Sequence, residues 1–157
     1  VISTGLTLLL PKYKIGDFVQ VPSLPFYSGV YLILHYLQLV MLSFLSFSDA
    51  DLLFIIGLIV YISGIFFYSA SMFYFAVSDF RKPAVKGMYK FSRHPVYLSF
   101  FVIIFGAALA SGNIILLLIN FLHFYSATKI MKAEEEKCLE EYGQEYKEYM
   151  SEVKRFI

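Results

Sequence analysis

Residues 52–76 read LLFIIGLIVYISGIFFYSASMFYFA and contain no charged side chain. As a helix, this run is long enough to cross a hydrocarbon core of roughly 30 Å. A second apolar run occupies residues 26–47, and only a short turn carrying Asp49 and Asp51 separates the two. These runs predict two membrane-spanning helices joined by a tight connection.

The composition of the whole chain favours a lipid environment. Of its 157 residues, 59% are hydrophobic and 16% are charged, whereas soluble domains are about 25% charged and about 45–50% apolar. A chain of this length has no soluble core large enough to bury the excess apolar side chains. An ordinary soluble domain is therefore disfavoured.

A third apolar stretch covers residues 96–130 and carries a single charge, Lys129. It is too long for one ordinary crossing. The turn-forming residues Ser111, Gly112 and Asn113 lie in its middle. We expect a helical hairpin with both arms in the membrane, the first arm being short and supported by its neighbours.

The first residues are also apolar, from Val1 to Leu10, and end at Pro11. We interpret them as the end of an earlier helix, followed by a Pro-rich re-entry that includes Pro22 and Pro25. The predicted fold is an all-α polytopic transmembrane bundle with about four full spans, this remnant helix and a helical tail. We expect one domain over residues 1–157, in which residues 1–78 carry the first spans and residues 79–157 the loop, hairpin and tail.

All basic residues fall on one side of this topology. They are Lys12 and Lys14, then Arg81, Lys82, Lys86, Lys90 and Arg93, and finally Lys129, Lys132, Lys137, Lys147, Lys154 and Arg155. The two turns on the other side have none. Since Lys and Arg near span ends stay in the cytoplasm, we predict a cytosolic loop and a cytosolic C-terminus.

The tail after Lys129 contains eight Glu residues and is therefore water-facing. An apolar stripe with helical spacing runs along it, formed by Leu139, Tyr142, Tyr146, Tyr149 and Val153. Gly143 interrupts the stripe and predicts a kink or a break into two short helices. The simplest interpretation is a solvated helix whose stripe rests on the membrane surface.

Residues 87–97 read GMYKFSRHPVY and form the first of two clusters with chemical potential. Gly87 permits a tight turn, and Pro95 suits the first turn of the following helix. Arg93 and His94 then lie just before that helix, where unpaired N–H groups favour an anion. The cluster predicts a receptor for a carboxylate or phosphate, and simple membrane anchoring by Arg93 is the alternative.

The second cluster is Glu134-Glu135-Glu136, where the last membrane helix leaves the bilayer. A run of charges is usually solvated. In a continuous helix, however, adjacent side chains point about 100° apart, so one carboxylate can face the bundle. Such a carboxylate near Arg93 and His94 would accept hydrogen bonds from hydroxyl or ammonium groups.

Several elements of the second half occur in a recognisable order. They are Gly87-x-Tyr89-x-x-x-Arg93-His94-Pro95-x-Tyr97, the hairpin, Glu134-Glu135, Gly143-x-x-Tyr146-x-x-Tyr149 and Val153-x-Arg155. This pattern resembles the isoprenylcysteine carboxyl methyltransferase family, which is similar to the phospholipid methyltransferases. It covers roughly residues 83–156. Met88 and Lys154 stand where Pro is common in the family.

The resemblance implies a membrane methyltransferase that uses S-adenosylmethionine as methyl donor and needs no metal. It implies that Arg93 and Glu135 are catalytic. It places these residues around the donor: Tyr89, Arg93, His94, Pro95, Tyr97, Glu134 and Glu135. The implied acceptor is a membrane lipid or another amphiphile, either a prenylcysteine-type carboxylate or a phospholipid amine. A nucleic-acid partner is not expected.

Two further histidines, His35 and His123, lie inside predicted spans. An ionisable residue there is a functional candidate. We expect instead that these two form hydrogen bonds between helices.

Two other functions remain open at this point. A membrane reductase of the sterol-reductase type shares the helical plan and a Pro-x-Tyr element, and it would bind NADPH. A non-enzymatic membrane scaffold would bind neither cofactor. The His94-Pro95 pair and the Glu134-Glu135 pair favour the methyltransferase.

Overall fold

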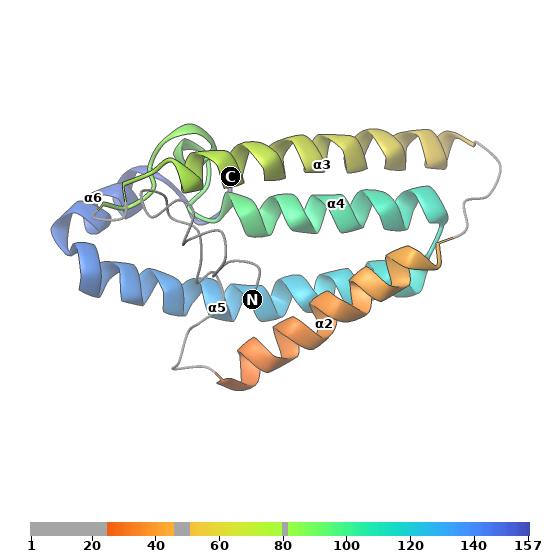
Figure 1. The fold of residues 1–157 in the computed structure, drawn as a ribbon, viewed down its shortest axis with the longest axis horizontal. Coiled ribbons are helices and arrows are strands. Elements are labelled where there is room, and N and C mark those ends of the chain that lie inside the picture. The colour runs from red at the N-terminus through yellow and green to blue at the C-terminus, as the bar shows by residue number, and fades with distance from the viewer. Residues whose placement is uncertain (1–24, 46–50, 80–81) are drawn as a thin grey trace, which may run out of the picture.

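A computed structural model describes residues 25–45, 51–79 and 82–157 of the chain. Within these ranges the regular elements are helices, and there is no strand. In chain order they are α2 (Pro25–Ser43), α3 (Leu52–Ala76), the 3-10 helix η1 (Gly87–Lys90), α4 (Pro95–Ser111), α5 (Ile114–Tyr142) and α6 (Gln144–Glu152) (Figure 1). The predicted all-α fold is confirmed. The predicted remnant helix at residues 1–10 lies outside the described residues, as do Pro11 and Pro22.

Three of the helices, α2, α3 and α5, are long and apolar enough to cross a membrane, and α4 is a shorter apolar helix. Large apolar side chains such as Ile33, Phe66 and Leu118 are exposed on their outer faces. An exposed apolar surface of this kind fits a lipid environment. The predicted span 52–76 coincides with α3. The helix predicted at residues 26–47 ends earlier, at Ser43.

The hairpin between α4 and α5 turns where the sequence predicts it. Gly112 ends α4 with a left-handed backbone (φ 63°), a conformation that favours glycine. Asn113 caps α5 by accepting a hydrogen bond from the Leu116 N–H at 2.9 Å. α4 has only 17 residues, and it lies between α3 and α5 (Figure 1). The expected support of a short arm by its neighbours is confirmed.

Glycines bring α3 and α4 into close contact. A Cβ atom at Gly57 would collide with the backbone of Ala110, and one at Gly106 would collide with the backbone of Tyr61. Small residues allow membrane helices to approach at this distance. Of the small residues in α3, Gly57, Gly64 and Ser71 are buried, whereas Ser69 is exposed.

α2 packs mainly on α5. The Gln38 amide donates a hydrogen bond to the Asn120 side chain at 3.3 Å. The rings of His35 and His123 lie nearby, with centroids 5.6 Å apart. Within the described part of the chain, His35 Nδ1 and His123 Nε2 are buried without a hydrogen-bond partner. The amide pair, rather than the histidines, therefore provides the hydrogen bond expected between these helices.

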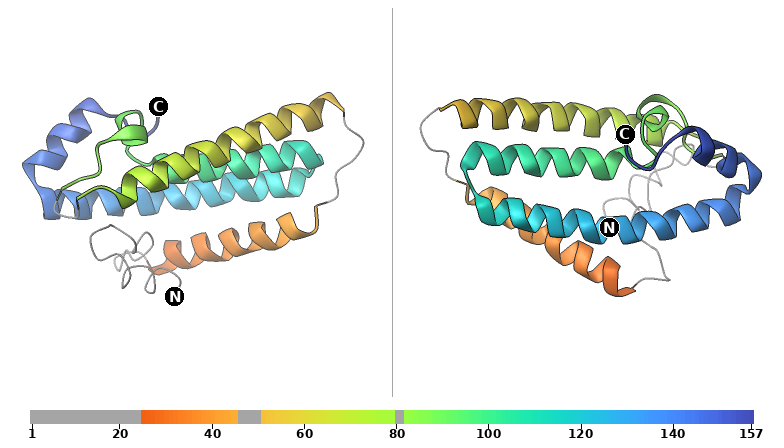
Figure 2. Two further views of the ribbon diagram at one scale, coloured as in Figure 1. Left: turned by 45° about the horizontal axis from the view of Figure 1, so that its top comes forward. Right: turned by 180° about the vertical axis from the view of Figure 1, so that it is seen from behind.

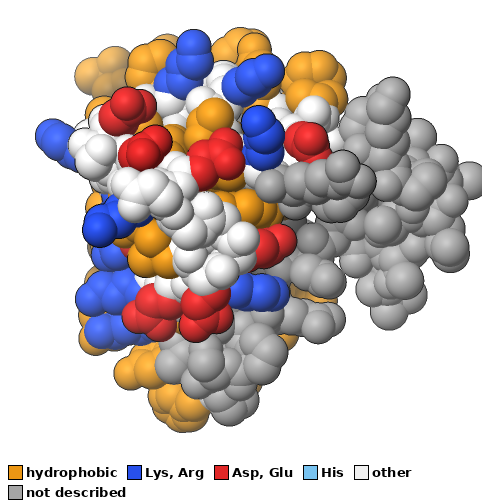
Figure 3. Space-filling view, turned by 90° about the vertical axis from the view of Figure 1, so that its left-hand side faces the viewer, with side chains coloured by type: hydrophobic (Ala, Val, Ile, Leu, Met, Phe, Trp, Pro, Cys, Tyr) orange, Lys and Arg blue, Asp and Glu red, His pale blue; other side chains and the backbone are white. Residues whose placement is uncertain are grey.

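The charged residues gather at one end of the bundle. α5 continues beyond its apolar part to Tyr142, and the chain then turns at Gly143, whose φ is 55°. Figure 2 shows α6 folding back from the end of α5 towards the α3–α4 connection. Acidic and basic side chains crowd on this end of the molecule (Figure 3). The predicted break at Gly143 is confirmed, and it brings the tail against the loop that opens α4.

Candidate active site

The connection from α3 to α4 has the backbone that its sequence predicts. Gly87 opens η1 with φ 61°, and a side chain at this position would collide with the Tyr74 ring. Pro95 is the first residue of α4, preceded by His94 at the cap position. The Ser92 hydroxyl accepts a hydrogen bond from the His94 N–H at 3.2 Å. This turn therefore fixes the backbone positions from which the side chains of Arg93 and His94 extend.

Arg93, His94 and Arg155 converge on one carboxylate, that of Glu135. Its Oε1 accepts hydrogen bonds from Arg93 Nε and Arg155 Nε, both at 3.0 Å. The same oxygen lies 3.1 Å from His94 Nε2, while Oε2 accepts from the Arg155 guanidinium. The Glu135 side chain is only 4% exposed. We call these four residues the clamp.

The clamp also fastens the C-terminal tail. The Arg93 guanidinium donates to the carbonyl oxygens of Met150 at 3.1 Å and Val153 at 3.0 Å. The Arg93 backbone N–H donates to the Lys154 carbonyl at 3.1 Å. The predicted anion receptor at the start of α4 is present, but its anion is the protein's own Glu135. These contacts make the clamp a closed, internally satisfied network.

The electrostatics of the clamp follow from burial and pairing. Burial lowers the pKa of His94, although its hydrogen bond to Glu135 acts in the opposite direction. The imidazole is therefore neutral at pH 7. The hydrogen bond to Glu135 raises the pKa of Arg155, so this guanidinium stays charged. The buried carboxylate is thus balanced by two permanent positive charges.

Glu134, the preceding residue, has a different environment. Its Oε1 accepts a hydrogen bond from the Tyr97 hydroxyl at 2.6 Å, and its Oε2 lies 3.6 Å from His94 Nδ1. The side chain is 22% exposed, against 4% for Glu135. Glu134 is therefore the carboxylate of the pair that an incoming cation reaches more easily.

Tyr89 is not among the residues that contact the carboxylates of Glu134 and Glu135 through the hydrogen bonds described above. Its side chain is buried and lies near the Phe75 ring, and its carbonyl oxygen accepts a hydrogen bond from the Tyr149 hydroxyl at 2.6 Å. Tyr146 packs beside Tyr149, with ring centroids 5.7 Å apart. The apolar stripe of the tail therefore packs on the protein at these tyrosines, not on a membrane surface.

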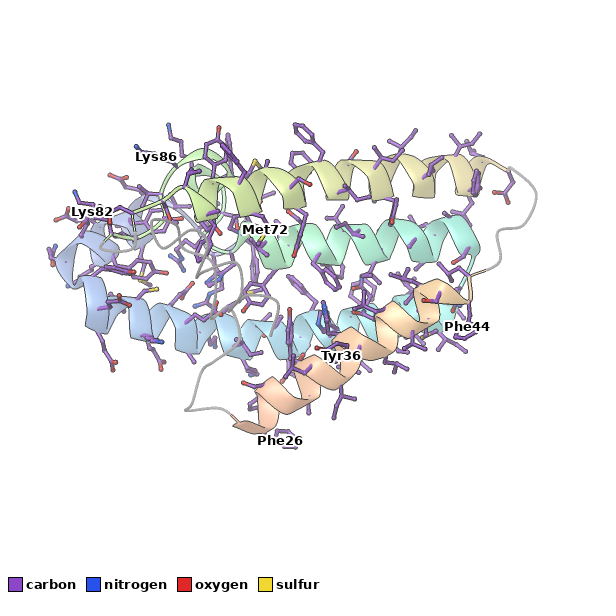
Figure 4. The ribbon with its side chains drawn as sticks, in the orientation of Figure 1. Phe26, Tyr36, Phe44, Met72, Lys82 and Lys86 are labelled. Atoms are coloured by element: carbon purple, nitrogen blue, oxygen red, sulfur yellow. The ribbon has the colours of Figure 1, made fainter. Side chains whose placement is uncertain are left out.

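A cavity of about 230 Å³ lies between α2, α3 and α4. It is lined by Tyr31, Leu32, His35, Tyr36, Tyr68, Met72, Val96, Tyr97 and Phe100. Figure 4 labels two of these residues, Tyr36 on α2 and Met72 on α3, as well as Lys82 and Lys86 at the charged end. Tyr97 joins the cavity to Glu134. Leu32 and Tyr36 are exposed on the outer surface, so the cavity wall reaches the lipid-facing side.

The structure brings together five of the seven residues predicted for the site. Arg93, His94, Tyr97, Glu134 and Glu135 form one cluster at the charged end. Pro95 shapes the turn beside them, and Tyr89 supports the tail from a short distance. Sequence reasoning did not assign a role to Arg155, although its position in the ordered pattern was a signal for it.

Comparison with protein families gave one finding. A family model described as phospholipid methyltransferase matches residues 45–145. The match covers more than half of the 157 residues and includes both clusters. Comparisons with curated proteins and with solved structures gave no match.

Proposed function

Because the chain belongs to the phospholipid methyltransferase family, we propose that it transfers a methyl group from S-adenosylmethionine to a lipid-borne or amphiphilic acceptor. Family membership and the three long apolar helices make it a membrane methyltransferase. The methyl donor, the acceptor and the site residues are our proposal.

One observation carries this proposal. Residues 93–97, at the start of α4, and residues 134–135, near the end of α5, meet in one cluster through direct hydrogen bonds. They are separated by a complete helical hairpin in the sequence. A site built from both ends of the hairpin fits a reaction at the boundary between membrane and water, where a soluble donor meets a lipid acceptor.

The residues present fit S-adenosylmethionine, which carries a positively charged sulfur and an ammonium group. Glu134 offers a partly exposed carboxylate at the charged end of the bundle. When bound, the donor supplies a methyl group activated by its positive sulfur; the acceptor's electron pair forms the new bond to carbon, and the old C–S pair stays on sulfur as a neutral thioether.

The protein contributes to methyl transfer by aligning the donor with the acceptor and by accepting a proton from the acceptor. Alignment of the reactants supplies much of the rate enhancement in such reactions. The clamp holds His94 and the start of α4 in place, which supports a positioning role for Arg93 and Glu135. Glu134 is linked to the cavity through its hydrogen bond with the Tyr97 hydroxyl, and it takes the proton that an ammonium acceptor must lose before its nitrogen attacks.

The acceptor reaches the site from the membrane. The cavity wall is lipid-facing at Leu32 and Tyr36, so a lipid enters between α2 and α3 while the donor arrives at the charged end. With the basic residues as a guide, α2 to α5 form a multi-pass bundle whose site faces the cytosol. Among the residues that the structure describes, no Lys or Arg lines the cavity, which favours a phospholipid amine over a prenylcysteine-type carboxylate.

Two measurements test the proposal. In a thermal-shift assay on the purified protein in detergent, S-adenosylhomocysteine should raise the melting temperature and NADPH should not. Stabilisation by NADPH instead would indicate a reductase, and stabilisation by neither would indicate a scaffold.

A radiolabelled methyl-transfer assay then identifies the acceptor. Purified protein is incubated with labelled S-adenosylmethionine and either total membrane lipid or prenylcysteine analogues. We expect label in the amine-containing lipids. Label in the prenylcysteine analogues alone would show that the acceptor is a carboxylate and not an amine.

A further inference from the structure

The cavity between α2, α3 and α4 has walls made largely of aromatic rings. Six of its lining residues carry rings: Tyr31, His35, Tyr36, Tyr68, Tyr97 and Phe100. They come from three helices. The rings of Tyr31 and Tyr97 meet edge to face, with centroids 5.9 Å apart and planes at 67°. His35 and Phe100 lie 4.6 Å apart at 32°. Rings from α2, α3 and α4 thus line one space and contact each other around it.

Within the described part of the chain, the cavity lining carries no positive charge. None of the lining residues there is Lys or Arg. The nearby carboxylate of Glu134 accepts a hydrogen bond from the hydroxyl of the lining residue Tyr97 at 2.6 Å. Aromatic faces carry negative electrostatic potential and attract cations, and boxes of such rings bind alkylated ammonium groups. The cavity is therefore complementary to a cation whose surface is apolar.

The size of the cavity limits what it holds. Its volume is about 230 Å³. That is smaller than the pockets of about 300–1,000 Å³ that enclose drug-sized ligands. A small head group with a few carbon atoms fits, whereas the acyl chains of a lipid must remain outside, along the exposed faces of α2 and α3.

We infer that this cavity is a cage for the methylated ammonium group of the acceptor, built by the rings of Tyr31, Tyr36, Tyr68, Tyr97 and Phe100 with Glu134 at its edge. The inference rests on the proposed function and adds a preference to it. The cage binds an amine that already carries one or two methyl groups in preference to a primary amine.

The preference follows from hydration and contact. A primary ammonium holds its water strongly and needs hydrogen-bond acceptors for three N–H groups, so burying it is costly. Each added methyl group replaces one N–H by an apolar surface that contacts the rings. A separate N-methylation of a primary amine therefore supplies the substrate of this protein, which completes the methylation.

A binding experiment tests the cage without requiring turnover. The probes are a short-chain phosphatidylcholine and its isostere with a 3,3-dimethylbutyl phosphate head, which has the same shape and no positive charge. The chain has no Trp and 13 Tyr, so tyrosine fluorescence of the purified protein reports binding. We expect the choline lipid to bind roughly five- to tenfold more tightly than its isostere.

Matched variants test which residues cause the preference for the choline lipid. Tyr68→Leu removes one wall of the cage and should abolish most of the preference, while Tyr68→Phe keeps the ring and should retain it. Tyr36→Leu is a second wall variant, at an exposed position that tolerates change. Tyr125→Leu is the control, because this ring is 60% exposed on α5 and does not line the cavity. Equal binding of both probes by the wild type, or an unchanged preference in both wall variants, would overturn the cage.

A kinetic comparison separates this inference from the proposed function. Phosphatidylethanolamine and its N-methyl and N,N-dimethyl derivatives, with identical acyl chains, are offered as acceptors. We expect KM to fall with each methyl group and the difference to shrink in Tyr68→Leu. Methyl transfer without a preference would refute the cage alone. Absence of transfer to every lipid, with the binding preference intact, would refute the proposed function alone.

Discussion

Glu134 and Glu135 are neighbours in α5, yet they belong to two regions that are built in opposite ways. Glu135 lies in the clamp, where Arg93, His94 and Arg155 occupy its oxygens. Glu134 lies at the edge of an aromatic cavity and remains 22% exposed. Successive residues of a helix point about 100° apart, so one turn of α5 serves both regions.

This difference teaches which residues hold the site and which receive ligands. A buried carboxylate with all its partners present has little capacity left for a ligand, and removing any partner leaves an uncompensated charge. A partly exposed carboxylate beside an apolar cavity can still bind a cation. The clamp therefore gives rigidity, and the cavity with Glu134 gives recognition.

The largest effect is expected for Glu135→Gln. In the wild type, two guanidinium groups and an imidazole contact the Glu135 carboxylate, whereas the glutamine amide would offer them a single neutral acceptor. Breaking a buried ion pair typically costs about 3–5 kcal/mol. We expect a lower melting temperature and at least tenfold weaker binding of S-adenosylhomocysteine by calorimetry in detergent. Wild-type affinity in this variant would show that the clamp does not shape the donor site.

His94→Ala comes next, because His94 touches both carboxylates. It removes the ring that contacts both Glu134 and Glu135 but leaves both arginines on Glu135. We expect loss of methyl transfer with normal insertion into the membrane, measured by activity and by membrane-fraction yield. Full activity would remove His94 from the site.

Glu134→Gln should have a smaller effect on stability and a selective one on binding. The amide oxygen still accepts from Tyr97, so the free energy of unfolding should change by about 1 kcal/mol or less. The loss of charge should weaken binding of S-adenosylmethionine up to about fivefold and leave S-adenosylhomocysteine, whose sulfur is neutral, nearly unaffected. Equal weakening of both, measured by calorimetry, would contradict a direct role near the sulfonium.

The smallest expected effect is a pH dependence of stability. Burial lowers the pKa of His94 in the folded state from its usual value of 6.5. As the pH falls through that value, the unfolded chain binds a proton that the folded chain resists, so stability falls. We expect the melting temperature of the wild type to fall relative to that of His94→Gln as the pH is lowered below about 6.5. Identical pH profiles would exclude His94 as the source.

Much of the helical plan could be predicted because its signals are local. The span 52–76 coincides with α3, since Asp51 caps its first turn and no charged residue interrupts it. Ser111 to Asn113 supply the turn of the hairpin, and Gly143 supplies the break before α6. The end of α2 at Ser43 was missed because the apolar composition continues beyond the helix.

The site could be predicted only in part. The sequence predicts that Arg93 and His94 lie near Glu134 and Glu135, because charges of opposite sign stand at the beginning and at the end of one hairpin. It could not tell which glutamate faces inwards, since that depends on the rotation of α5. Nor could it assign Arg155, which reaches Glu135 only because Gly143 folds the tail back. The cavity could not be predicted either, because its walls come from three helices whose relative positions the sequence does not give.

One measurement tests the central claim, that the turn at the start of α4 and the acidic end of α5 form a single donor site. Labelled S-adenosylmethionine is crosslinked to the purified protein by ultraviolet light, and the labelled peptides are mapped by mass spectrometry. We predict label in the peptides containing residues 93–97 and 134–135, and competition by S-adenosylhomocysteine. Competable label confined to peptides from other parts of the chain, with none in either of these, would contradict the account.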